Sequence, residues 1–257
     1  MNIFKQLFKS LYSPRDIASF RFQGIGKTIL YVFFLTFISI LPSVYFLSSG
    51  LVNGVNEVEK SLDSELPPFQ IENGELHSDH KAPVILNKEN FTIIFDSTGT
   101  VDTGDLNNSR NTIAILQNSA YFIAGGQIQS LPYSMFSDIS ITNDDLLEIL
   151  ATVNSSLAII IPLLGVVILI FASGAKFIEV SFLALLGLLL KKMLNRNIQY
   201  RHTWRLAAYS VTLPTIFFTI MDSLQTAVPN GALLNWLVAY IILFLTIKEI
   251  PQPKAKK

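Results

Sequence analysis

LAIIIPLLGVVILIFASGAKFIEVSFLALLGLLL, residues 157–190, is the stretch that decides the fold of this chain. Its 34 residues carry only two charges, Lys176 and Glu179, so water cannot solvate the segment. A helix needs roughly 20 apolar residues to cross about 30 Å of hydrocarbon. The stretch therefore predicts an integral membrane protein.

Three more apolar runs, at residues 28–47, 206–221 and 232–247, approach the length of a membrane span. Half of the 257 residues are hydrophobic and 15% are charged, a balance that fits membrane helices joined to one polar domain. We therefore predict four spans. A cleaved signal peptide is the competing account of the first run, but the run is longer than a typical signal-peptide core and no A-x-A-like site follows it.

The charges are strongly segregated, although the formal net charge is zero. Residues 49–155 hold fifteen acidic and four basic side chains, a net charge of −11, whereas the first 27 residues, the loop at 191–205 and the C-terminal tail are basic. Positive residues near span ends tend to stay in the cytoplasm. We therefore place both termini and the basic loop inside the cell, and the acidic region outside.

This topology divides the chain into eight segments. They are cytoplasmic amphipathic helices at 1–27, a first span at 28–48, an extracytoplasmic β-rich domain at 49–155, a long second span at 156–190, a basic cytoplasmic loop at 191–205, a third span at 206–223, a fourth span at 232–248 and a cytoplasmic tail at 249–257. A 34-residue helix is about 51 Å long, so the second span must project from the membrane, lie partly in the interface, or break near 173–176. A break would give five spans, which hydropathy favours and the charge rule opposes.

Helix signals occur at the N-terminus and at the end of the predicted outer region. Apolar residues recur at helical spacing within residues 3–11, which predicts an amphipathic helix on the inner membrane face, and we interpret it as an anchor rather than a partner-binding helix. Ser-Pro-Arg-Asp at 13–16 is a helix start signal. Thr-Asn-Asp-Asp at 142–145 should cap the helix that enters the second span.

The outer region changes to a β pattern after Pro67-Pro68. Asn73-Gly74 is a hairpin-type turn, and short strand candidates follow at 91–95, 112–116, 119–124 and 127–131. We expect a small antiparallel sheet, and we expect residues 67–141 to fold alone. The predicted fold class is a membrane α-helical bundle with a small extracytoplasmic antiparallel β (α+β) domain. The chain has no cysteine, which excludes disulfides.

No motif in the chain indicates catalysis. Gly-Ile-Gly-Lys-Thr at 24–28 resembles the end of a P-loop, but the first glycine of that motif would fall at Arg21. His77 and Asp79, with Glu75 nearby, could converge as metal ligands, yet we interpret this segment as a solvated turn because no distant histidine or cysteine completes the shell. We predict no enzyme activity, no cofactor and no metal.

Lys176 and Glu179 form the most informative polar pair, because they lie one helical turn apart in an apolar run where an unpaired charge is costly. Together with Asp222, at the outer end of the third span, they are our candidate intramembrane polar site. Alternatively, the pair marks the boundary between the membrane part of a helix and its projecting part, and Asp222 is a loop residue. Pro162 and Pro214 should kink their spans.

A second candidate site is the basic loop, whose side chains could contact anionic lipid or a cytoplasmic partner. Its members are Lys191, Lys192, Arg196, Arg201 and Arg205.

Five stretches carry a resemblance to a known family: SLYSPRD at 10–16, FRFQGIGK at 20–27, FQIENGEL at 69–76, KFIE at 176–179 and YRHTWR at 200–205, continued by Tyr209 and Pro214. The chain resembles an uncharacterised family of multi-pass membrane proteins from Gram-positive bacteria, some of them labelled maltodextrin-utilisation proteins. Its final hairpin is distantly similar to Yip1-type membrane proteins. The resemblance implies a bacterial plasma membrane and a role beside carbohydrate uptake, and it implies no catalytic residues.

We therefore predict a non-enzymatic accessory, sensing or scaffolding protein at the cell surface. The alternative is a small transporter or channel subunit that uses Lys176, Glu179 and Asp222, although four spans without an internal repeat argue against it. The expected partners are the lipid bilayer, membrane transporter subunits or a second copy of the chain, and not nucleic acid.

Overall fold

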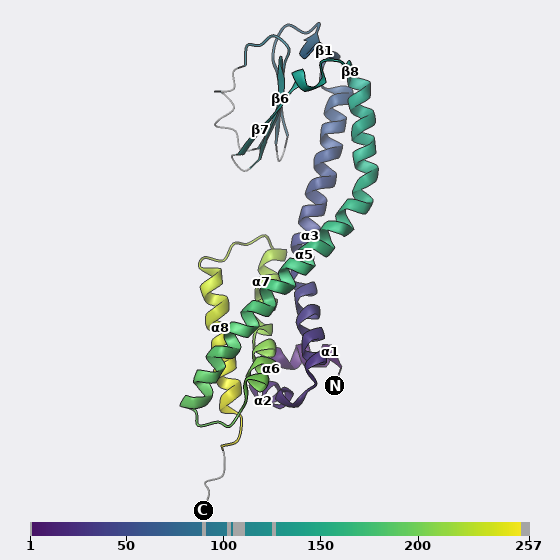
Figure 1. Cartoon of the computed structure of the whole chain (residues 1–257). Coiled ribbons are helices and arrows are strands. Elements are labelled where there is room, and N and C mark those ends of the chain that lie inside the picture. Colours follow the sequence, from purple (N-terminus) through teal and green to yellow (C-terminus); the bar gives the residue numbers. More distant parts are fainter. Residues whose placement is uncertain (1, 89–90, 102–103, 105–110, 125–126, 253–257) are drawn as a thin grey trace, which may run out of the picture. The chain divides into compact units, whose positions relative to one another are not determined.

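The computed structural model describes residues 2–88, 91–101, 104, 111–124 and 127–252 (Figure 1). The chain forms two compact units. Unit 1 comprises Met1–Ser48 and Ile161–Lys257, and unit 2 comprises Ser49–Ile160. Two long helices, α3 (Ile25–Ser64) and α5 (Asn143–Met193), contribute residues to both units. The chain therefore leaves unit 1 within one helix and returns to it within another.

The remaining elements of unit 1 are helical. They are α1 (Ile3–Tyr12), α2 (Pro14–Ser19), η1 (Phe20–Phe22), α6 (Tyr200–Ser210), α7 (Thr212–Ser223) and α8 (Gly231–Lys248). Four segments of the described chain are long and apolar enough to cross a membrane, at 25–64, 143–193, 200–223 and 231–248. Four apolar helices could thus span a membrane.

α5 is continuous through residues 173–176, so it lacks the break that a fifth span would need. Large apolar side chains stay exposed along it, among them Ile159, Phe171 and Leu189. Soluble proteins rarely expose so much contiguous apolar surface, whereas lipid would cover it. α5 has 51 residues and α3 has 40, about twice the length that a span requires, so each continues well beyond one.

The third predicted span, at 206–223, is not one continuous helix. α6 ends at Ser210 and α7 begins at Thr212. Pro214 lies in the first turn of α7, where its missing N–H costs little. Both helices belong to one segment, 200–223, that is long and apolar enough to cross a membrane. Its interruption after Ser210 fits the kink expected at Pro214, because a proline cannot donate to the carbonyl four residues before it. Pro162, by contrast, lies inside α5.

The two N-terminal helices form as predicted, and α1 packs on the rest of unit 1 through small and polar side chains. Gln6 and Ser10 are buried, while Phe4 and Phe8 are exposed. The polar stripe of α1 faces the protein because the Gln6 Oε1 atom lies 3.1 Å from the Tyr209 hydroxyl. Phe8 lies exposed on the outer face of α1, and Phe4, although exposed as well, packs edge-to-face against Phe34 of α3 at 5.3 Å between ring centroids.

The core of unit 1 is built around two tyrosines. The rings of Tyr31 and Tyr209 lie 4.4 Å apart, and both side chains are fully buried. The Tyr31 hydroxyl is 2.6 Å from Thr212 Oγ1, and the Tyr209 hydroxyl lies 3.0 Å from Gln23 Oε1. A buried hydroxyl without a partner would be costly, so these contacts join α3, α6 and α7 to the N-terminal segment.

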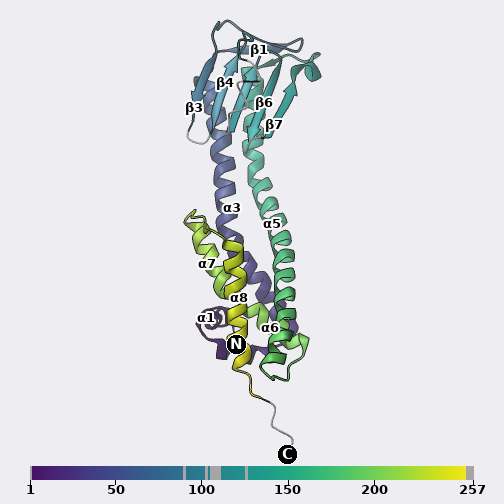
Figure 2. The same cartoon turned by 90° about the vertical axis from the view of Figure 1, so that its left-hand side faces the viewer.

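Unit 2 contains two sheets (Figure 2). The three-stranded sheet has the order β2-β1-β8 and the five-stranded sheet the order β3-β4-β5-β6-β7. Their bounds are β1 (Phe69–Glu72), β2 (Glu75–Ser78), β3 (Val84–Asn87), β4 (Thr92–Asp96), β5 (Asn111–Leu116), β6 (Ser119–Ala124), β7 (Gln127–Pro132) and β8 (Ile141–Thr142), with η2 (Tyr133–Phe136) before β8. The four strand candidates are confirmed, and so is the β1–β2 hairpin, whose turn residues Asn73 and Gly74 have positive φ.

The prediction of a purely antiparallel sheet is wrong. β4 and β5 pair in parallel, with Thr92 opposite Thr112. A parallel pair needs a crossover connection, and the alternation of apolar residues within a strand does not encode the direction of its neighbour. β3 was also missed, because its apolar residues Val84, Ile85 and Leu86 are consecutive and do not alternate with polar ones.

The core of unit 2 joins the sheets to the helix ends. Leu62 and Leu66, at and just after the end of α3, and Leu146 and Leu147 of α5 pack with buried sheet residues such as Phe95. The capping prediction is also confirmed, because Thr142 N–H donates to the Asp145 carboxylate at 2.8 Å. A fragment of residues 67–141 therefore lacks part of its own core.

Asp96, at the end of β4, organises the turn that follows it. One carboxylate oxygen accepts from the Thr98 N–H at 2.8 Å and the other from the Val101 N–H at 2.7 Å. The Thr98 and Thr100 hydroxyls donate to it as well. Burial raises the pKa of Asp96, but these donors outweigh burial and hold the pKa below its usual value.

Candidate functional site: a polar pocket in unit 1

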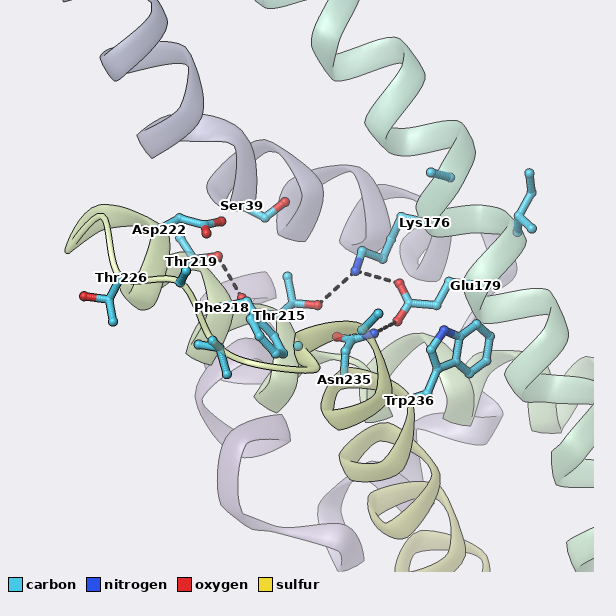
Figure 3. Close-up of a pocket in the computed structure, with 16 residues that line it drawn as sticks. Ser39, Lys176, Glu179, Thr215, Phe218, Thr219, Asp222, Thr226, Asn235 and Trp236 are labelled. Atoms are coloured by element: carbon cyan, nitrogen blue, oxygen red, sulfur yellow. Dashed lines mark hydrogen bonds and ion pairs between the residues drawn. The ribbon is translucent and has the colours of Figure 1, made fainter. Parts of the chain in front are cut away.

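α3, α5, α7 and α8 line a cavity of about 770 Å³ in unit 1, which we call the polar pocket (Figure 3). Small-molecule sites usually have about 300–1,000 Å³. The polar side chains on its wall are Ser39 of α3, Lys176 and Glu179 of α5, Thr215, Thr219 and Asp222 of α7, Thr226 between α7 and α8, and Asn235 of α8. The structure therefore brings Lys176, Glu179 and Asp222 to the wall of one cavity.

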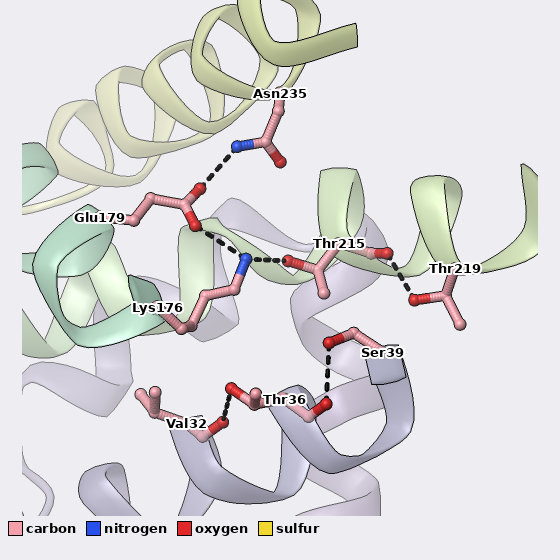
Figure 4. Close-up of polar contacts among 8 residues, drawn as sticks. All are labelled: Val32, Thr36, Ser39, Lys176, Glu179, Thr215, Thr219 and Asn235. Atoms are coloured by element: carbon pink, nitrogen blue, oxygen red, sulfur yellow. Dashed lines mark hydrogen bonds and ion pairs between the residues drawn. The ribbon is translucent and has the colours of Figure 1, made fainter. Parts of the chain in front are cut away.

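Lys176 and Glu179 stand at the centre of a hydrogen-bonded chain that crosses three helices (Figure 4). Lys176 Nζ donates to Glu179 Oε2 at 2.7 Å and to Thr215 Oγ1 at 3.1 Å. Asn235 Nδ2 donates to Glu179 Oε1 at 2.6 Å. Both carboxylate oxygens of Glu179 are therefore occupied, and α5 is tied to α7 and α8.

The helical spacing of the pair makes this chain possible, because side chains at i and i+3 lie on the same helix face. The two side chains are only 15% and 14% exposed. Charges that lose water are tolerated where each finds a counter-charge and further hydrogen bonds. Lys176 and Glu179 meet both conditions, since each also has a neutral partner on another helix.

The other side of the polar pocket is formed by Asp222, Ser39 and Thr219, as Figure 3 shows. Asp222 is exposed. The Ser39 hydroxyl donates to the Thr36 carbonyl and the Thr219 hydroxyl to the Thr215 carbonyl, each at 2.8 Å. A hydroxyl has one proton to donate, so both side chains present only lone pairs to the cavity.

The polar pocket ends at Thr215, which is 4% exposed. One turn earlier on α7, Thr212 is fully buried and is hydrogen-bonded to Tyr31. From that level toward α6 the unit is a closely packed core that includes Tyr209 and Leu206. The pocket is thus closed at this end by protein.

Sequence reasoning missed Ser39, Thr215 and Asn235 as lining residues. A signal existed for Asn235, which is the single amide within the apolar run of α8, and polar groups in such runs are costly unless they are used. Ser39 and Thr215 had no comparable signal. Serine and threonine are common in apolar helices because they can donate to their own backbone.

The basic loop candidates divide into two groups. Three of them donate to backbone carbonyls of unit 1: Lys191 to Ile198, Arg196 to Lys248 and Arg205 to Arg21, at 2.6, 2.9 and 2.8 Å. These contacts hold the fold together. Lys192 and Arg201 are exposed, so they are the members left for lipid or a partner.

The segment around His77 lies at the surface of unit 2. Glu75 and His77 of β2 are exposed, and so is Asp79 beyond it. Within the described residues, no three side chains of His, Cys, Asp or Glu come together in a way that could hold a metal ion.

The fold and the pocket define a class of protein: a mostly helical chain with four apolar helices that could span a membrane, and an α+β unit inserted between the first and second of them. The chain belongs to the DUF1189 family, described as proteins of unknown function, whose family model matches residues 4–247. No curated protein and no solved structure matches the chain. Family membership agrees with the resemblance to an uncharacterised family.

Proposed function

We propose that this protein is a non-enzymatic integral protein of the bacterial plasma membrane that binds a small ligand in the polar pocket and acts as a sensing or scaffolding accessory at the cell surface. A link to maltodextrin utilisation is part of the proposal, and the resemblance of the five sequence stretches supports it. Lys176 Nζ donates to Thr215 Oγ1 at 3.1 Å, so in this arrangement the lysine does not act as the base that would activate the threonine hydroxyl.

The closed inner end of the polar pocket is the observation that carries this proposal. A conduit would need an open path through the whole unit, whereas beyond Thr215 the side chains of Thr212 and Tyr31 are fully buried and hydrogen-bonded to each other. A cavity that ends within the protein favours binding over passage. Its partly buried charges also require a reason, because groups of this kind in apolar helices usually serve a function.

A small transporter or channel subunit is the second candidate. The observation in its favour is that Lys176, Glu179 and Asp222 line the same cavity. Secondary transporters usually place such groups between structural repeats that rock against each other. The sequence has no internal repeat, so we rank this function second.

The proposed topology has both termini in the cytoplasm and unit 2 outside, and the distribution of charge supports it. Because the chain has no cysteine, single cysteines can report on it. In intact cells, an impermeant maleimide should label Asp79→Cys at once and Asn195→Cys only after permeabilisation. Both positions are exposed, so the reverse pattern would invert the topology.

The accessory role can be tested with the full chain purified in mild detergent. We expect carbohydrate-transporter subunits to copurify in stoichiometric amounts, and we expect a deletion strain to grow poorly on maltodextrin. Solute uptake by proteoliposomes that contain this protein alone would favour the transporter instead. Normal growth of the deletion strain, together with purification of the protein without partners, would remove the link to carbohydrate.

A further inference from the structure

The polar pocket is not electrically neutral. Its lining has one lysine against two carboxylates, a net charge of −1. Lys176 and Glu179 compensate each other at 2.7 Å. The Asp222 carboxylate, in contrast, has no hydrogen-bonded or ionic partner among the described residues, although it lies on the wall of the cavity. The pocket therefore has one unmatched negative charge, on the side opposite the ion pair.

The groups beside Asp222 accept hydrogen bonds and do not donate them toward the cavity. The hydroxyl protons of Ser39 and Thr219 are used by backbone carbonyls. An occupant of this side must therefore supply the donors itself. A carboxylate with two hydroxyl acceptors matches a group that has a positive charge and several N–H bonds.

From this arrangement we propose that the polar pocket binds a small organic molecule through its primary ammonium group, which donates to Asp222, Ser39 and Thr219. A bare metal ion fits less well, because the cavity of about 770 Å³ is much larger than a coordination shell. A quaternary ammonium has the charge but no N–H, so it cannot satisfy the two hydroxyls.

This inference rests on the proposed function, since it names the ligand of the same pocket. Two sources could supply the ammonium group: a soluble amine, or the ethanolamine headgroup of a membrane lipid. The chemistry of recognition is the same for both. The experiment therefore needs one arm without amine-bearing lipid and one arm with it.

The test uses the full chain in nanodiscs of phosphatidylglycerol and follows the fluorescence of Trp236, in a Trp204→Phe background that removes the other tryptophan. Ethanolamine, choline and ethylene glycol are titrated in turn. Ethanolamine should bind more tightly than choline, and ethylene glycol, which has a hydroxyl in place of the ammonium, should not bind. Adding phosphatidylethanolamine to the discs should abolish the response to free ethanolamine if the lipid is the natural source, and leave it unchanged if a soluble amine is.

Two variants localise the binding. Asp222→Asn removes the unmatched charge at an exposed position, so the fold should survive, and it should weaken ethanolamine binding about tenfold or more. Ser39→Ala should weaken ethanolamine binding but leave choline binding unchanged. Glu249→Gln is the matched control, because it removes an exposed carboxylate of unit 1 outside the pocket, and it should bind like the wild type.

Equal binding of ethanolamine and choline, or tight ethanolamine binding by Asp222→Asn, would overturn the assignment. The same holds if no amine binds in either kind of nanodisc. That last result leaves the proposed accessory role standing if transporter subunits still copurify, so the two failures can be told apart.

Discussion

Replacing Glu179 with glutamine should destabilise unit 1, because it removes the counter-charge of Lys176 without changing the shape of the side chain. Glu179 accepts two hydrogen bonds, at 2.7 Å from Lys176 and at 2.6 Å from Asn235. A glutamine has one carbonyl oxygen, so one of the two donors loses its partner. Lys176 would then depend on Thr215 and on whatever water enters the pocket.

The size of the effect follows from the exposure of the pair. Breaking a fully buried ion pair costs about 3–5 kcal/mol, and a hydrogen bond to a charged group contributes about 1.5–3 kcal/mol. Since the side chains are 15% and 14% exposed, water offsets part of the loss, and we expect about 2 kcal/mol. For a chain of this length, this corresponds to a fall in melting temperature of about 4–8 °C.

The assay is thermal unfolding of the purified protein in nanodiscs, followed by the fluorescence of its two tryptophans. The double variant Lys176→Met with Glu179→Gln removes the stranded ammonium, so it should regain most of the lost stability. Glu249→Gln should melt like the wild type. If Glu179→Gln and the double variant also melt like the wild type, Lys176 and Glu179 do not form a partly buried ion pair.

Three further outcomes are expected. Gly187→Ala should destabilise unit 1 by about 1–2 kcal/mol in thermal unfolding, because a Cβ there would come within 3.2 Å of the buried Thr203, whereas Gly174→Ala on the same helix meets nothing within 4 Å and should be neutral or stabilising. Asp96→Ala should destabilise unit 2 by about 2–4 kcal/mol. Because folding lowers the pKa of Asp96, the ionised carboxylate stabilises unit 2 fully above its unfolded pKa, and this stabilisation is lost as the pH falls below about 4. Circular dichroism at a series of pH values can follow the loss. A fragment of residues 49–160 should melt cooperatively, and one of residues 67–141 should not, because the shorter fragment lacks the helical leucines of the core; cooperative melting of both would contradict this.

The strands of unit 2 show which features of the fold the local sequence pattern predicts. The candidate at 119–124 coincides with β6, and the Asn73-Gly74 turn joins β1 to β2. These features depend on alternation and on turn residues, which are properties of a few neighbouring positions. The parallel pairing of β4 with β5 is not such a property. It depends on how the chain returns to the sheet, which no short window of sequence contains.

In unit 1, too, some features could be predicted from the sequence and others could not. The apolar runs and their lengths could be predicted from the sequence, because each run must by itself be long enough to cross the membrane and must satisfy its own backbone hydrogen bonds. The breaks between helices were less readable, since the same proline can kink a helix interior or begin a helix. The position of Pro214 was settled by where α6 stops.

By itself, the sequence determined that the chain has four apolar helices, a polar region between two of them, and a lysine and a glutamate one turn apart on the longest apolar run. Only the tertiary structure decided what this pair contacts. Thr215 is 39 residues from Lys176, and Asn235 is 56 residues from Glu179. Spacing along one helix determines which side chains share its face, whereas partners on other helices depend on how the helices pack.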